Sequence, residues 1–195
     1  MVLLKTYNEP AICEKEILRY AGCKEADNSI RELLDECIEE ARDNLTYKVC
    51  YRELSVCTDG KICDFEYFCV PSEKLSVNLR GCKKVIIFAA TVGTALDRLI
   101  AKYNRIAPSK AVMLHAIGSE RIEALCDAFC EDISSEYNIK LKPRFSPGYG
   151  DVPLSVQKSF FDLLGCEKRL GIALLDSLMM SPSKTVTAFV GLCDN

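Results

Sequence analysis

The stretch YKVCYRELSVCTDGKICDFEYFCV, Tyr47–Val70, follows a period of two and has Asp59-Gly60 near its centre. This period is typical of strands with one buried face, and Asp-Gly is a strong signal for a tight hairpin turn. The sequence therefore predicts a β-hairpin with one mainly apolar face. Folding about the turn predicts four cross-strand pairs, which are Val56/Cys63, Leu54/Phe65, Arg52/Tyr67 and Cys50/Cys69.

Two helices are predicted ahead of the hairpin. The first begins where Asn8 offers a cap two residues before Pro10, and it ends at Gly22. The second is capped by Asp27 or Asn28, and its apolar residues recur three and four positions apart. We expect these two helices to form one antiparallel pair.

The elements after the hairpin complete the pattern. They are a helix over 72–79, a buried strand over 84–91, a helix after Gly93, a long helix after Pro108, a short helix over 155–164 and a strand over 184–190. The long helix carries an apolar stripe, with acids such as Glu120, Asp127 and Glu131 largely away from it. This order indicates the α+β class, with a mixed or antiparallel sheet, a β-hairpin and a long central helix.

The composition is that of a globular chain with a substantial core, because 49% of its 195 residues are hydrophobic and 27% are charged. We expect one domain over 1–195, made of a helical pair over 1–45 and an α+β core over 46–195. The net charge of -3 and the scattered basic residues argue against a nucleic-acid partner. We also expect no membrane span and no secretory signal, and hence a cytoplasmic protein.

Twelve cysteines and a single histidine limit the chemistry. The six-residue spacing that begins at Cys57 and the four-residue spacing after Cys126 match no zinc or iron–sulfur signature, so we expect no bound metal. In a reducing cytoplasm the cysteines are expected to be reduced structural thiols. His115 lies on an apolar periodic segment and is expected in the core. Motifs for dinucleotide binding and for a P-loop do not occur.

Residues 143–153, PRFSPGYGDVP, contain three prolines and two glycines and follow neither the helical nor the strand periodicity. A rigid loop is therefore predicted. Arg144 suits a two-pronged grip on a carboxylate or phosphate, and Tyr149 can stack on a ligand or donate a hydrogen bond. Gly148 and Gly150 permit a ligand to approach the backbone closely. The alternative is a rigid turn in which Arg144 pairs with a surface acid.

This loop resembles the S-adenosylmethionine loop of the activation domain of cobalamin-dependent methionine synthase. The family's loop reads Arg-x-Ala-Pro-Gly-Tyr, then three residues and Pro; residues 144–149 and Pro153 match it, with Ser146 in place of Ala. The similarity continues through Leu-Leu, Glu-Lys, Met-Ser-Pro and Thr-Val-Thr within 163–187, and it extends upstream to about Val85. The N-terminal part is similar to small, stand-alone members of the group.

The resemblance implies a subunit that binds S-adenosylmethionine and docks on the cobalamin-binding module of a methyltransferase. There, a methyl group from S-adenosylmethionine and one electron from a flavodoxin-like or other donor restore methylcobalamin from cob(II)alamin, in support of methionine synthesis. Arg144 would hold the ligand carboxylate, Ser146 would offer backbone groups, and Tyr149 would lie between ligand and corrin. The implied cofactor-binding residues are Arg144, Ser146, Pro147, Gly148, Tyr149 and Asp151. No acid–base catalytic residue is implied.

One residue of the family pattern has no counterpart here, namely the N-terminal acid that holds the ligand amino group. Glu123 on the long helix or Asp151 in the loop is the candidate replacement. Two further readings stay open beside a methyltransferase component. One is a non-catalytic docking module for a corrinoid methyltransferase that no longer binds S-adenosylmethionine. The other is a binding domain for a different carboxylated small molecule held by Arg144.

Overall fold

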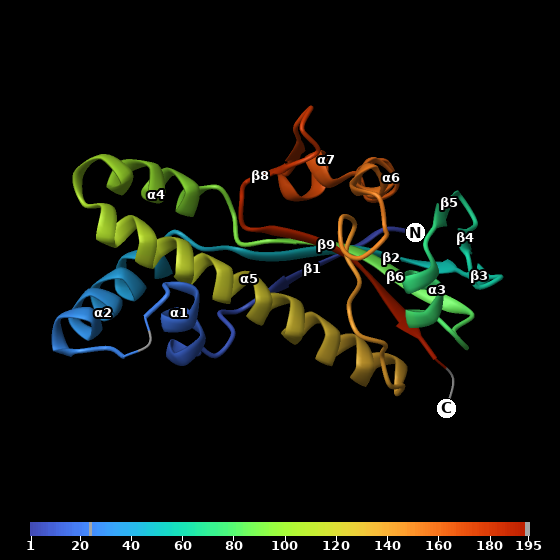
Figure 1. Cartoon of the computed structure of the whole chain (residues 1–195), viewed down its shortest axis with the longest axis horizontal. Helices are drawn as coiled ribbons and strands as arrows, with labels where there is room; N and C mark the ends of the chain where they lie inside the picture. Colours follow the sequence, from blue (N-terminus) through green and yellow to red (C-terminus); the bar gives the residue numbers. More distant parts are fainter. Residues whose placement is uncertain (24, 194–195) are drawn as a thin grey trace.

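The structure is a computed structural model, and it describes residues 1–23 and 25–193. Its strands are β1 (Leu3–Tyr7), β2 (Tyr47–Ser55), β3 (Cys57–Thr58), β4 (Ile62–Phe65), β5 (Phe68–Pro71), β6 (Lys84–Thr91), β7 (Ala173–Leu174), β8 (Met180–Ser181) and β9 (Thr185–Leu192) (Figure 1). Its helices are α1 (Glu14–Tyr20), α2 (Asn28–Arg42), α3 (Glu73–Asn78), α4 (Ala95–Ile106), α5 (Pro108–Tyr137), the 3₁₀ helix η1 (Leu154–Val156), α6 (Gln157–Leu164) and α7 (Cys166–Leu170).

The central sheet has the strand order β1-β2-β6-β9, and every neighbouring pair is antiparallel. This confirms the predicted α+β class. In β6, Phe88 lies opposite Tyr51 of β2 and Ala188 of β9. Phe88 enters the hydrophobic core on one face of the sheet, whereas its neighbour Ile87 enters a second core on the other face. Burial on both faces explains why this strand is continuously apolar.

Helix α5 is the centre of the layer on the first face. It spans most of the long dimension of the molecule, and α1, α2 and α4 each pack against it (Figure 1). Its Phe129 contacts Tyr51 and Phe88 of the sheet, with ring centres 5.2 Å and 4.8 Å away. At Gly118 the packing is so close that a Cβ atom would lie 2.5 Å from Leu96 Cδ2 of α4.

The second face is covered by α3, α6, α7 and a small antiparallel sheet in the order β3-β4-β5. Phe189 of β9 is central to this layer, with the rings of Phe65 and Phe160 4.9 Å and 4.8 Å from its own. Gly165, at φ +61°, ends α6 and begins the five-residue α7, which the sequence pattern did not predict. Strands β7 and β8 form a separate two-stranded pair.

The predicted hairpin is only partly correct. The chain does turn at Asp59-Gly60, but Thr58 pairs with Cys63, so the register differs by two residues from the predicted one. The longer strand β2 leaves the hairpin and joins the central sheet, where Leu54 pairs with Val85. Because β2 buries residues on both faces between β1 and β6, the long-range pairing is favoured over the local one.

The N-terminal region also differs from the prediction of a plain helical pair. Leu3–Tyr7 forms the edge strand β1, so this region contributes to the central sheet, and α1 begins only at Glu14. Helices α1 and α2 each pack on α5. The predicted cap of α2 is confirmed, because the Asp27 carboxylate accepts from the backbone N–H of Ile30 over 2.9 Å.

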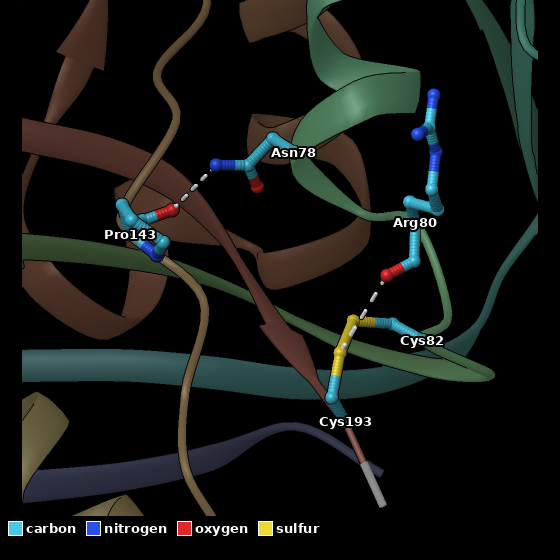
Figure 2. Close-up of a disulfide and its surroundings, with 5 residues drawn as sticks. All are labelled: Asn78, Arg80, Cys82, Pro143 and Cys193. Atoms are coloured by element: carbon cyan, nitrogen blue, oxygen red, sulfur yellow. Dashed lines mark hydrogen bonds between the residues drawn. A yellow bond between two sulfur atoms is a disulfide. The ribbon is translucent and has the colours of Figure 1, made fainter.

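Three predictions about single side chains are wrong. The expectation of reduced thiols fails at Cys82, just before β6, and at Cys193, just after β9, which form a disulfide; it is confirmed for the other ten cysteines, which are free thiols (Figure 2). His115 is exposed on α5 rather than packed in the core. Glu120 is buried, with only 4% of its surface exposed, because it pairs with a second buried charge described below.

Candidate ligand-binding site

The loop that carries Arg144 is attached to the open edge of β9. The N–H of Lys142 donates to Gly191 O over 2.9 Å, and Phe145 exchanges two backbone hydrogen bonds with Phe189, of 3.0 Å and 2.8 Å. Asn78 of α3 donates to the carbonyl of Pro143 over 3.1 Å (Figure 2). The backbone on both sides of Arg144 is therefore fixed, and the side chain leaves from a rigid base.

The remainder of the loop is a tight turn, as predicted. Tyr149 N–H donates to Ser146 O, and Gly148 N–H donates to Val152 O, over 3.1 Å and 3.0 Å. Gly148 and Gly150 have φ angles of +83° and +63°, which favour glycine. Pro147 is buried, Ser146 is half-buried and Gly148 is exposed.

The Arg144 guanidinium reaches from the loop to α5. Its Nη1 donates to Asp127 Oδ1 and its Nη2 to Glu123 Oε2, both over 2.6 Å. The two acids are four residues apart and so share one helix face. The Arg144 side chain is 24% exposed; burial alone would lower its pKa, but the neighbouring Cys126, Asp127 and Glu123 outweigh burial and raise it. In this structure Arg144 thus pairs with acids, as expected from the alternative in which the loop is a rigid turn and Arg144 binds a surface acid.

The two acids proposed from sequence lie in different places. Glu123 is brought to Arg144, whereas Asp151 is directed at the first turn of α3. There Asp151 accepts from the Ser72 hydroxyl and from the backbone N–H groups of Glu73 and Lys74. These hydrogen bonds, with that of Ser72 the strongest influence, hold the pKa of Asp151 below its ordinary value.

Tyr149 is the exposed member of the site. The residue is 67% exposed, and its ring meets the Phe145 ring edge-on with the centres 5.3 Å apart. A phenol placed in this way is supported at its base by an aromatic contact and presents the rest of its ring to solvent.

A groove of about 690 Å³ runs beside the acids, between α5 and a wall made of α1 and the segment that leads into it. Its lining residues are Pro10, Ala11, Cys13, Glu16, Tyr20, Glu120, Glu123, Ala124, Asp127, Ala128 and Glu131. Five of these described residues are acids, and none is Lys or Arg. Asp127 also borders a second hollow of about 480 Å³ that Arg144 lines, so the Arg144–Asp127 pair lies where the two hollows meet.

The sequence pattern did not predict Asp127 as a partner of Arg144, nor the groove wall formed by residues 10–20. The spacing of Glu120, Glu123 and Asp127, which places them on one helix face, was the one feature of the sequence that indicated an acidic surface here. The wall itself comes from a segment far away in sequence, and its position depends on tertiary packing. Within the described part of the chain, no group of three or more His, Cys, Asp or Glu residues is placed to hold a metal ion.

These features define an α+β protein in which the central helix α5 and residues 10–20 enclose an acidic groove, and in which Arg144 of the Pro/Gly loop binds two of the acids that line it. Among solved structures, its fold matches that of the MetH reactivation domain bound to AdoHcy, with a TM-score of 0.71 and 15% identity over 98% of this chain and 78% of that one. The match confirms the fold expected from the resemblance at residues 144–149. By sequence, the chain matches no family profile and no curated protein.

Across residues 1–23 and 25–193, no helix combines the length and apolarity needed to span a membrane.

Proposed function

We propose that this chain binds S-adenosylmethionine at the Arg144 loop and supports the reductive remethylation of cobalamin carried by a partner module of a methionine synthase. The observation that carries the proposal is the meeting of the Arg144 guanidinium with the carboxylates of Glu123 and Asp127 beside the groove. The structural neighbour supports it, because that domain is bound to AdoHcy.

The charges of this cluster suit the amino-acid end of the ligand, which carries one carboxylate and one ammonium group. Arg144 would exchange one of its acidic partners for the ligand carboxylate, which a guanidinium grips with two parallel hydrogen bonds. Glu123 would take the ligand ammonium group and thereby replace the acid that is missing from the N-terminal pattern. Asp151 would fix the loop through α3, and Ser146, Pro147 and Gly148 would border the ligand with backbone groups.

The groove suits the remainder of the ligand in size and charge. A volume of about 690 Å³ is within the ordinary range for small-molecule sites. Four of the groove's five acids pair with arginines that do not line it, and a turn of Arg144 toward the ligand carboxylate would free a carboxylate of α5 for the positively charged part of the ligand. When bound, S-adenosylmethionine supplies an activated methyl group on a sulfonium. The work of the protein is to orient that methyl group, with Tyr149 exposed between the site and the corrin face of the partner. The electron would come from a flavodoxin-like or other donor.

Calorimetric titration tests this proposal. S-adenosylmethionine should bind the wild type, and Arg144→Ala should weaken binding by about 1.5 to 3 kcal/mol, the range for a hydrogen bond to a charged group. Arg144→Lys should also lose affinity, because a point charge cannot reproduce the planar fork. Arg105→Ala, at an exposed arginine in the last turn of α4 that does not line the groove, is the matched control. Absence of saturable heat with the wild type would refute the proposal.

One observation favours the alternative of a docking module that does not bind S-adenosylmethionine, namely that both terminal nitrogens of the Arg144 guanidinium, Nη1 and Nη2, already have carboxylate partners. This alternative predicts no heat with S-adenosylmethionine, together with a change in the absorbance of a cobalamin-loaded partner. Binding heat with another carboxylated metabolite that disappears in Arg144→Ala would instead identify a binding domain for a different carboxylated small molecule.

A further inference from the structure

Two consecutive charged residues in the middle of α5 are buried. Glu120 is 4% exposed and Arg121 is 1% exposed, and Arg121 donates to Glu120 through Nε and Nη2. Removing two charges from water is costly, and an apolar pair of similar volume often gives equal or greater stability. Stability alone therefore does not explain this pair.

The pair does something that an apolar pair cannot do, because it binds three backbone groups of one short segment. Arg121 Nη1 and Nη2 donate to the carbonyls of Pro10 and Ala11 over 2.6 Å and 2.7 Å. Glu120 Oε1 accepts from the N–H of Cys13 over 3.1 Å. Residues 8–13 have no regular secondary structure, so these side chains supply the hydrogen bonds that a helix or strand would otherwise give.

The segment held in this way is one wall of the groove, and the other wall is α5 itself. Pro10, Ala11 and Cys13 line the groove opposite Glu123 and Asp127. Glu120 lies one helical turn before Glu123, so the residue that fixes the wall and the residue proposed to hold the ligand ammonium group share one helix face.

We propose that Glu120 and Arg121 are positioning residues that set the distance between the 10–13 wall and α5, and so the affinity of the groove for its ligand. This inference rests on the proposed function, because it assigns the groove to S-adenosylmethionine. Neither residue touches the ligand in this proposal. Each acts through the backbone that it holds.

The decisive variant is the double substitution Glu120→Met/Arg121→Met. It removes both charges together, so no unpaired buried charge remains. Water can take over the backbone groups of Pro10, Ala11 and Cys13, because these residues are half-buried or exposed, and the melting temperature should therefore stay close to that of the wild type. The dissociation constant for S-adenosylmethionine should rise by about tenfold, the lower end of the losses found when residues that orient metal ligands are removed. Hydrogen exchange at the Cys13 amide should accelerate by a similar factor, because its acceptor is gone.

The control is Leu164→Ala, a buried residue of the second core that does not line the groove. It should lower the melting temperature through a cavity while it preserves Cys13 protection and ligand affinity. An unchanged Cys13 exchange rate in the double variant would overturn the inference, as would wild-type affinity combined with lost Cys13 protection. Absence of binding to the wild type would overturn the proposed function instead, and the exchange measurement would still decide whether the pair holds the wall.

Discussion

Arg144 and Asp151 lie seven residues apart in one loop, and their side chains bind helices on opposite faces of the central sheet. Arg144 binds α5 in the layer of the first face, and Asp151 binds α3 in the layer of the second. Between them the loop pairs with the edge of β9. The loop therefore extends from one layer to the other, and its two anchors can be tested separately.

The first prediction concerns the anchor on α5. Glu123→Gln should weaken S-adenosylmethionine binding by about 1.5 to 3 kcal/mol, because an amide cannot replace a carboxylate opposite an ammonium group. Calorimetry measures this effect. Glu136→Gln is the control, since Glu136 lies on the same helix but pairs with Lys5. Equal affinities of the Glu123 variant and the wild type would assign the ammonium group to another residue.

Tyr149→Ala should leave the melting temperature nearly unchanged, because the residue is 67% exposed and its ring makes an edge contact with Phe145. It should slow the remethylation of a partner's cob(II)alamin when reductant and S-adenosylmethionine are supplied. Stopped-flow absorbance of the corrin follows the reaction, and Tyr67→Ala, another exposed tyrosine, is the control. Remethylation at the wild-type rate would remove Tyr149 from the docking face.

The anchor on α3 predicts a dependence of stability on pH. The pKa of Asp151 is lowered from 3.8 by the Ser72 hydroxyl and by backbone N–H groups of α3. A carboxylate whose pKa is lowered by folding stabilises the folded state, and its full contribution is present at pH values above the ordinary pKa of 3.8. This contribution is lost as the pH falls through the lower pKa that the group has in the folded state. Asp151→Asn should therefore melt below the wild type at about pH 6, and the difference should shrink as the pH is lowered below 3.8. Parallel melting curves across this range would contradict the anchor.

Gly118→Ala should destabilise the fold, although alanine is ordinarily the better helix former. The new Cβ would lie 2.5 Å from Cδ2 of the buried Leu96 on α4 and 2.9 Å from Cγ of the half-buried Lys184 just before β9, so both side chains would have to move. We expect a loss of about 1 to 3 kcal/mol, as is typical of overpacking. Urea unfolding measures it; a stabilised variant would mean that α4 moves aside at little cost.

The Cys82–Cys193 disulfide should stabilise the chain by about 3 to 5 kcal/mol, because it closes a loop with a sequence separation of 111 residues. Cys82→Ser should lower the midpoint of urea unfolding by the corresponding amount, whereas Cys57→Ser, at an exposed free thiol, should not. Thiol titration of the unfolded, unreduced protein provides a direct count. Twelve reactive thiols would show that the bond does not form.

Much of the fold could be predicted from the sequence, because strong periods and breakers reflect local rules. The continuous apolar run of β6, Pro108 at the start of α5 and the Pro/Gly loop after residue 142 were all placed correctly. The partner of β2 could not be predicted, since a strand buried on both faces pairs according to tertiary packing. Strand β1 was missed because Leu3–Tyr7 is a short, partly exposed edge strand with a weak pattern.

The candidate site was only partly predictable for the same reason. Its loop carries a recognisable motif, so Arg144 and Tyr149 could be singled out from local sequence. The partners of Arg144 depend on how the loop crosses α5, which no local rule specifies. Burial of Glu120 and Arg121 was unexpected, because charged residues at a helix centre are ordinarily solvated. They are buried because a segment more than a hundred residues away covers them.

The attachment of the Arg144 loop to β9 has a consequence for the behaviour of the protein in solution. Lys142 and Phe145 occupy backbone groups of Gly191 and Phe189 that would otherwise form an open sheet edge. Open edges are templates for pairing with another chain, and natural proteins protect them. A cut or an insertion that frees this loop should therefore promote self-association of the protein, even where the rest of the fold is intact.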